Sequence, residues 1–203
     1  EYYLCIICKD GRFKKVLYDN EMLKTNRAFT IIKTKKENKI VNSFITTQNK
    51  ILIIITSIGR LFKYKLDNKH IVPASKQAQG TILNKLFPRE EIISCCTCRT
   101  NEQIVIITKK GTFFRIKENE IYDSFKSKLG FTDGKLQINN DSFLNIITDN
   151  KHCEVVTNKG KSAKINFSKL KVNTSTKKYQ IDFLNFENDE YINNIYFSKN
   201  LID

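Results

Sequence analysis

The chain has 203 residues and a formal net charge of +14, from 35 Lys and Arg against 21 Asp and Glu. With 40% hydrophobic residues it has enough apolar side chains for a core, which excludes wholesale disorder. Its longest apolar run, Ile51 to Ile55, is far shorter than the roughly 18 residues that cross a bilayer, so we expect no membrane partner. The basic charge favours nucleic acid as partner, with A/T-rich coding bias as the alternative origin of the lysines.

One pattern occurs four times along the chain. Each copy is an apolar run, a two-residue polar turn with glycine, and a second strand with aromatic residues, which is typical of a β-hairpin. The glycine supplies the positive φ that such a turn requires. The hairpins are expected over residues 4–16, 52–64, 104–116 and 153–165, around Gly11, Gly59, Gly111 and Gly160 at spacings of 48, 52 and 49 residues.

Each hairpin is followed by a polar connector and a further apolar stretch. These stretches are Ile40–Ile45, Ile92–Cys95, Phe143–Ile147 and Tyr191–Tyr196, and shorter ones precede them at Thr30–Ile32 and Ile82–Leu83. Four short strands in a unit of about 50 residues are typical of propeller blades, which must stack face to face to bury their surfaces. The sequence predicts a single all-β repeat domain over 1–203, with four-stranded blades at 1–45, 46–96, 97–148 and 149–203.

Basic residues recur at two positions relative to the glycines. A Lys or Arg lies four residues after each of the four hairpin glycines, and a second lies in each connector, 16 or 17 residues after that glycine. We interpret the first column as a basic rim: Lys15, Lys63, Arg115 and Lys164. The connector column is Arg27, Lys76, Lys128 and Lys177, with Lys14, Arg60 and Lys161 as supporting candidates. Protection of exposed edge strands by lysine, and ordinary solvated loop lysines, are the alternatives.

The cysteines and histidines do not form a pattern that predicts a site. The cysteines are Cys5, Cys8, Cys95, Cys96, Cys98 and Cys153. Cys5 and Cys8 have the spacing of a metal knuckle, but residues three apart in a strand point to opposite faces and cannot bind one ion. We therefore expect reduced thiols packed as small apolar residues, no metal site, no catalytic residue and no cofactor in this chain.

The segment from Gly59 to Ile93 carries a more specific pattern. It has a Gly-Arg hairpin at 59–66, a Pro-Ala-Ser connector with basic residues ahead of a glycine at 73–80, and an apolar-Asn run closing at Leu-x-Pro at 82–88. Glu-x-Ile at 90–92 then opens the next strand. This segment resembles the C-terminal domain of the DNA gyrase A protein. The other three units match as hairpin plus connector, so the resemblance covers nearly the whole chain.

The resemblance implies a β-pinwheel, a propeller-like disc whose neighbouring blades exchange strands, here as an open arc of about four blades or part of a larger disc. It implies that double-stranded DNA bends around the basic outer rim, presenting a segment for strand passage and negative supercoiling. The parent enzyme is a type IIA DNA topoisomerase, an isomerase that uses ATP and Mg²⁺ outside this chain. The gyrase B protein and the rest of the gyrase A protein are the implied protein partners.

The seven-residue basic box of gyrase corresponds here to a degenerate stretch. It keeps one arginine and has no glycine: Lys24, Thr25, Asn26, Arg27, Ala28, Phe29 and Thr30. A topoisomerase IV-like domain that binds DNA without chiral wrapping is therefore an alternative, and a β-propeller scaffold for protein partners is another. The A/T-biased composition suits a relict plastid (apicoplast) or the cytoplasm and nucleoid of an A/T-rich bacterium.

Overall fold

The fold is described from a computed structural model, which describes residues 1–19, 22, 24, 28, 30–124, 136–148, 152–170, 179–180 and 186–197. The strands of the first half are β1 (Tyr2–Cys8), β2 (Arg12–Tyr18), β3 (Ile40–Thr46), β4 (Ile51–Thr56), β5 (Leu61–Lys65), β6 (Thr81–Ile82) and β7 (Ile92–Cys98). Those of the second half are β8 (Gln103–Thr108), β9 (Thr112–Lys117), β10 (Phe143–Thr148), β11 (Cys153–Thr157), β12 (Ser162–Ile165), β13 (Tyr179–Gln180) and β14 (Ile192–Phe197). The described residues also include two short 3-10 helices, η1 (Glu118–Glu120) and η2 (Phe167–Lys169). Among the described residues, no helix has the length and apolar character needed to span a membrane.

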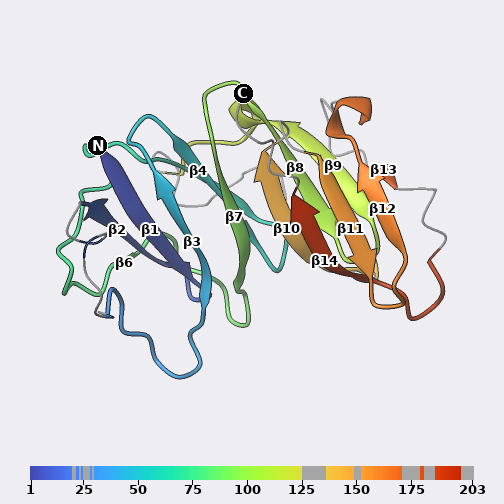
Figure 1. The fold of residues 1–203 in the computed structure, drawn as a ribbon, viewed down its shortest axis with the longest axis horizontal. Helices are drawn as coiled ribbons and strands as arrows, with labels where there is room; N and C mark the ends of the chain where they lie inside the picture. Colours follow the sequence, from blue (N-terminus) through green and yellow to red (C-terminus); the bar gives the residue numbers. More distant parts are fainter. Residues whose placement is uncertain are drawn as a thin grey trace.

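The strands form four small antiparallel sheets that follow one another across the molecule (Figure 1). We call them blades 1 to 4: β3-β1-β2-β6, β5-β4-β7, β10-β8-β9-β13 and β12-β11-β14. Each blade is built on one of the expected hairpins, and the last strand of each unit returns to pair with the first strand of its hairpin. The prediction of an all-β pinwheel is confirmed.

Neighbouring blades exchange edge strands. β6 lies in the connector of the second unit but pairs with β2 of blade 1, and β13 of the fourth unit pairs with β9 of blade 3. The stretch around Ile82 is thus a strand, as expected, but it pairs in the sheet of blade 1 and not in the sheet of blade 2. The expected strand at Thr30–Ile32 is absent, because this part of the first connector is irregular and its Ile31 carbonyl oxygen accepts a hydrogen bond from the Lys14 side chain. An exchanged strand ties two blades together through backbone hydrogen bonds.

Glycine at position 80 is required by this exchange. Gly80 has a φ of +76°, and a Cβ built there would lie 2.5 Å from the carbonyl oxygen of Phe13 in β2. Gly160, in the turn between β11 and β12, has a similar φ of +80° but no atom within 4 Å of a built Cβ. The two glycines therefore share a backbone conformation and differ in the space around them.

We expect the substitution Gly80→Ala to destabilise the protein by about 3 kcal/mol or more, because the segment that leads into β6 must move away from β2. The substitution Gly160→Ala is the matched control, with the cost of its left-handed φ alone, about 1–2 kcal/mol. Chemical denaturation of both variants measures the difference. Equal losses would show that the approach of Gly80 to Phe13 imposes no constraint.

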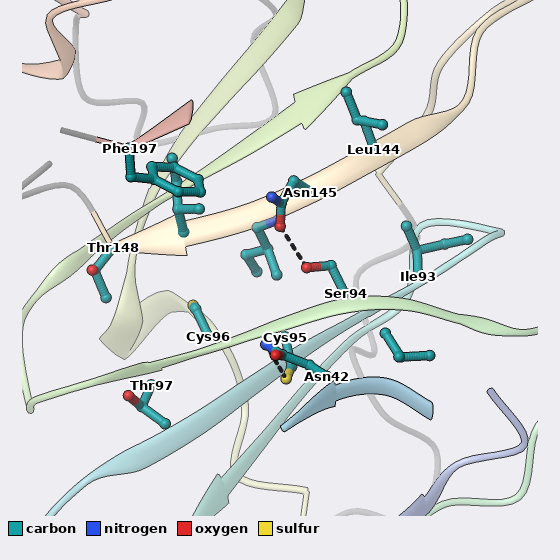
Figure 2. A pocket seen from close by; sticks show the side chains of 13 residues that line it. Asn42, Ile93, Ser94, Cys95, Cys96, Thr97, Leu144, Asn145, Thr148 and Phe197 are labelled. Atoms are coloured by element: carbon teal, nitrogen blue, oxygen red, sulfur yellow. Dashed lines mark hydrogen bonds between the residues drawn. The ribbon is translucent and has the colours of Figure 1, made fainter. Parts of the chain in front are cut away.

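The last strands of the units are β3, β7, β10 and β14. They line a cavity of about 520 Å³ (Figure 2). Ser94 of β7 donates to Asn145 Oδ1 of β10 at 2.5 Å, and the Asn42 amide of β3 lies 3.7 Å from the sulfur of Cys95. Polar contacts between the last strands of neighbouring blades thus hold the blades together beside this cavity.

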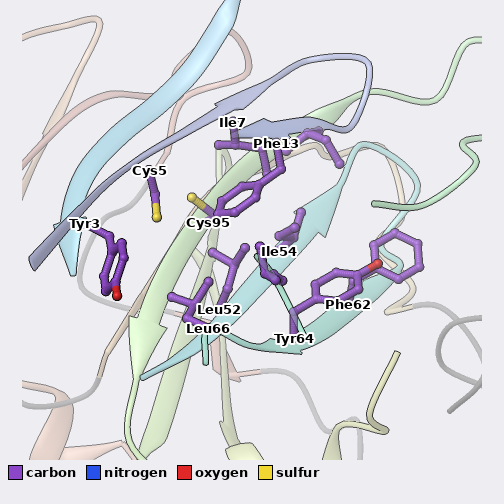
Figure 3. Packing of buried hydrophobic residues seen from close by; sticks show 12 residues of the cluster. Tyr3, Cys5, Ile7, Phe13, Leu52, Ile54, Phe62, Tyr64, Leu66 and Cys95 are labelled. Atoms are coloured by element: carbon purple, nitrogen blue, oxygen red, sulfur yellow. The ribbon is translucent and has the colours of Figure 1, made fainter. Parts of the chain in front are cut away.

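The hydrophobic core consists of layers between blades. Between blades 1 and 2, Tyr3, Cys5 and Phe13 pack against Leu52 and Ile54 (Figure 3). The alternate side chains of β4, including Ile53, belong to the next layer, between blades 2 and 3. Because β4 is covered on both faces, all six of its residues are buried. This explains the uninterrupted apolar run at 51–55, since a strand exposed on one face would alternate with polar residues.

Blade 4 differs from the others on one face. In blades 1 to 3 the positions six residues before the hairpin glycine are apolar and fully buried, as in Cys5, Ile53 and Val105, and they face the next blade. The corresponding residue in blade 4 is Glu154, which is partly exposed and lies opposite Lys164 in the register of β11 and β12. Among the described residues, the far face of blade 4 therefore lacks the apolar layer found between blades.

Candidate nucleic-acid interface

The basic column predicted for the rim begins at Lys15, and this side chain is buried, with 1% of its surface exposed. Its Nζ donates to the carbonyl oxygens of Leu66 and Ile71 and to Asn68 Oδ1, all in blade 2, and lies 4.4 Å from the centre of the Tyr3 ring. Burial lowers the pKa of Lys15. All three donors of the ammonium are used. The prediction that Lys15 lies on an accessible rim is wrong.

The next two members of the column also contact the following blade. Lys63 Nζ of blade 2 lies 2.9 Å from Glu118 Oε1 and 3.3 Å from the Glu118 carbonyl oxygen in blade 3. The guanidinium of Arg115 in blade 3 donates to the carbonyl oxygen of Leu170 in blade 4. The residue four after the glycine thus lies on the face that packs against the next blade. The prediction that this column forms a row of exposed cations is therefore wrong for Lys63 and Arg115 as well.

Lys164, the fourth member of the column, is exposed. It lies on the far face of blade 4, beside a pocket lined by His152, Glu154, Tyr196 and others. The same sequence position therefore has two environments, which depend on whether a blade follows in the described structure.

Two supporting candidates are buried as well. Lys14 donates to the carbonyl oxygens of Ile31 and Lys76, the latter at 2.7 Å, and burial lowers its pKa. Arg60 forms a two-point ion pair with Glu90, at 2.8 Å from Nε to Oε1 and 2.6 Å from Nη2 to Oε2. Neither cation is on the accessible surface, because each satisfies groups inside the fold; their prediction as surface DNA contacts is wrong.

Two further candidates, the exposed Lys161 and the partly exposed Lys76, are paired with acidic residues. Lys161 Nζ lies 2.8 Å from Glu190 Oε2 and 3.5 Å from Glu187 Oε1. Lys76 Nζ lies 3.3 Å from Asp19 Oδ2. An acidic neighbour neutralises much of the field that a phosphate would meet, so these two lysines are weaker candidates than unpaired ones.

The carboxylate of Glu190 accepts hydrogen bonds from two residues of blade 4, and we call this set of contacts the Glu190 anchor. Hydrogen bonds from Lys161 and from the Thr157 hydroxyl, at 2.8 and 2.7 Å, lower its pKa from 4.5 to about 2. Because the folded-state pKa is depressed, this anchor stabilises the fold above pH 4.5 and is lost as the pH falls toward about 2.

We expect the difference in melting temperature between wild type and Glu190→Gln to be largest above pH 4.5 and to shrink as the pH falls toward about 2. Thermal unfolding across that range measures it. The substitution Glu187→Gln, at a side chain that is 60% exposed, is the control and should have a smaller effect. A difference that does not vary with pH would contradict the role of Glu190 as a charged partner.

Several candidates lie outside the described residues. These are Arg27, Lys128 and Lys177 of the connector column, and Thr25, Asn26 and Phe29 of the box-like segment. The remaining residues of that segment, Lys24, Ala28 and Thr30, are exposed.

Other cations, which belong to neither of the two repeating columns, are exposed and form no ion pair with a described residue. They lie in turns, connectors and strand ends: Lys33, Lys35, Lys36, Lys39, Lys65, Lys69, Lys85, Arg89, Arg99, Lys110, Lys117 and Lys169. The densest group is in the first connector, where four lysines fall within residues 33–39. Local clustering in a polar segment was the sequence signal that could have identified this group.

The cysteines lie in the strands as expected. Five of the six are buried, and Cys96 is partly exposed. Burial raises the pKa of Cys5, Cys95, Cys98 and Cys153 to about 12, so these thiols are protonated and unreactive. Within the described part of the chain, no group of three or more His, Cys, Asp or Glu side chains is arranged to hold a metal ion.

Three solved structures that superpose on this chain are C-terminal domains of DNA topoisomerase IV, of ParC and of DNA gyrase A. That of DNA topoisomerase IV superposes with a TM-score of 0.71 at 18% identity, over 85% of this chain and 54% of its own length. That of the Escherichia coli ParC protein gives 0.66 at 13% identity, over 97% and 79%. That of DNA gyrase A gives 0.59 at 12% identity, over 97% and 82%.

The chain thus spans about half the length of the topoisomerase IV domain. No family model matches the sequence, and no curated protein matches it significantly. At these identities the likeness concerns the fold, and the chain has the β-pinwheel fold of the gyrase A C-terminal domains.

Proposed function

We propose that this chain is the DNA-binding domain of a gyrase A-type protein, the DNA-cleaving component of a type IIA DNA topoisomerase. The observation that carries the proposal is the pinwheel fold, shared with the topoisomerase IV, ParC and gyrase A domains, together with a net charge of +14. The partner is double-stranded DNA, and the contacts are the exposed cations of turns and connectors that form no ion pair with a described residue. The domain contributes binding, while cleavage, ATP hydrolysis and Mg²⁺ binding belong to the rest of the enzyme.

Binding of this kind reads the backbone and not the bases. Lysines on long side chains meet phosphates, release counterions and give an affinity that falls steeply with salt. Bending about 50 bp through a half circle costs on the order of 9 kcal/mol by an elastic estimate. Several phosphate contacts must offset this cost, which a dispersed set of unpaired cations along a curved molecule can supply.

Two modes of DNA binding differ in their topological result. In the gyrase-like mode, DNA wraps around the domain with a single handedness, and this supports negative supercoiling. In the topoisomerase IV-like mode, the domain bends DNA without chiral wrapping. The box-like segment at 24–30 lacks glycine, which favours the second mode. We also propose that the domain associates with the remainder of the gyrase A-type protein and with its gyrase B-type partner. The proposed location is a relict plastid or a bacterium.

The test is binding of a labelled duplex to the 203-residue chain over a range of salt, followed by ligation of nicked plasmid with the protein bound. We expect binding that weakens linearly in log–log form with salt and shows no sequence preference. A shift in linking number indicates chiral wrapping, and tight binding without a shift indicates the topoisomerase IV-like mode. Absence of binding at low salt would overturn the proposed function.

A further inference from the structure

The basic column makes the same kind of contact at three successive boundaries between blades. Lys15 reaches the segment that follows β5, Lys63 reaches the segment that follows β9, and Arg115 reaches the segment that follows β12. In each case a cation on the second hairpin strand of one blade donates to at least one backbone oxygen just past the second hairpin strand of the next blade. The three boundaries between blades 1 and 4 therefore have the same kind of contact at equivalent positions.

The backbone of the same residues takes part in these boundaries. The Lys15 carbonyl oxygen accepts from the Ala74 amide at 2.7 Å, and the Lys63 carbonyl oxygen accepts from the Ser124 amide at 2.9 Å. The Lys63 amide also donates to the Ser124 hydroxyl at 2.9 Å. Lys15 and Lys63 therefore lie where the backbone of the next blade's connector contacts the sheet.

These contacts are directional, unlike the apolar layers beside them. Leucine and isoleucine side chains can slide against each other with little change in energy, whereas an ammonium between fixed carbonyl oxygens has one favourable geometry. Lys63 is 15% exposed and its partner Glu118 is 5% exposed, so water screens this pair little. A second bond, from the Asn101 amide to Glu118 Oε2 at 3.0 Å, holds the carboxylate in place.

We propose that Lys15, Lys63 and Arg115 are positioning residues, which fix the angle between neighbouring blades and thereby set the curvature that the domain imposes on DNA. This inference rests on the proposed function. It gives the column a role in the shape of the protein, while the exposed lysines of the connectors contact phosphate. Lys164 occupies the same position without this contact, because its face of blade 4 carries no following connector among the described residues.

The test compares two lysines of blade 2 that carry the same charge. The substitution Lys63→Met breaks the contact with Glu118, and Lys69→Met removes an exposed connector lysine. Both variants and wild type are bound at saturation to a duplex of about 50 bp, a length that must bend to follow a half circle, with fluorophores at both ends. Energy transfer reports the bend, and a salt titration of affinity reports the number of phosphate contacts.

We expect Lys63→Met to reduce the energy transfer at saturation to less than half of the increase that wild type produces, with an unchanged salt slope. For Lys69→Met we expect unchanged energy transfer and a salt slope lower in magnitude by about 0.9, the value for one phosphate contact. The substitution Lys63→Arg, which keeps a donor to Glu118, should restore most of the bend.

Two outcomes would overturn the inference. A lower salt slope in Lys63→Met would make Lys63 a phosphate contact, and an unchanged bend with only a lower melting temperature would make it a stabilising residue. If wild type does not bind DNA, the proposed function fails, and the positioning role is read from the free protein. Amide hydrogen exchange at Ser124 should then accelerate in Lys63→Met and not in Lys69→Met, and equal protection in both would refute the role.

Discussion

Replacement of Lys33 and Lys35 by glutamine is expected to weaken binding of duplex DNA on the order of 60-fold at about 0.1 M salt. The estimate follows from two phosphate contacts, each of which contributes a log–log salt slope of about −0.9. Both side chains lie in the first connector, are exposed, and have no acidic partner among the described residues. Fluorescence anisotropy with a labelled duplex at several salt concentrations measures the affinity and the slope, which should fall in magnitude by about 1.8.

The matched control removes two lysines that already have acidic partners. Lys9 lies 2.9 Å from Glu91, and Lys159 lies 2.5 Å from Glu187. Replacement of both by glutamine lowers the net charge by the same amount, so general attraction to DNA changes equally in the two variants. We expect a loss of less than roughly tenfold for the control, because neither lysine is expected to contact a phosphate. Equal losses would mean that overall charge, and not the first connector, determines binding.

The substitution Glu90→Ala is expected to destabilise the fold by about 3–5 kcal/mol, because it leaves the Arg60 guanidinium buried without a counter-charge. Arg60 is also stacked against aromatic rings, 4.8 Å from the centre of Phe62 and 4.4 Å from that of Phe87. Burial raises the pKa of Glu90, but hydrogen bonds from Arg60 and from the Phe87 amide outweigh it, so the pKa is lowered overall. The carboxylate is therefore charged at neutral pH, and its removal should lower the melting temperature by roughly 10 °C.

The neighbouring residue provides the control for this prediction. Glu91 pairs with Lys9 at the surface, where the two side chains are 49% and 39% exposed. An exposed pair contributes about 0–1 kcal/mol, so Glu91→Ala should be nearly neutral. Thermal and denaturant unfolding of the two variants compares a buried with an exposed carboxylate at adjacent positions. Similar losses would show that burial of the Arg60–Glu90 pair has no energetic consequence.

The fold could be predicted from the sequence because its determinants are local. Apolar runs on both sides of a turn glycine specify hairpins, and the repetition at a spacing of about 50 residues implies blades that pack on each other. The uninterrupted run at Ile51–Ile55 belongs to a strand that the structure shows covered on both faces. Arg60 and Glu90 belong to the sequence pattern on which the resemblance was based. In the structure these two residues form a buried ion pair between the hairpin and the strand that returns to it.

The accessibility of the cations could not be predicted in the same way. Lys15 and Lys164 occupy equivalent positions in the repeat, yet one is buried against blade 2 and the other is exposed. Their local sequences contain no information on this difference, since a lysine side chain can extend into solvent or cross to a neighbouring carbonyl oxygen. The outcome depends on whether another blade supplies acceptors within reach. The sequence alone thus determined the strands, turns and blade repeat, whereas only the packing of whole blades decided which positive charges hold the protein together and which remain for a partner.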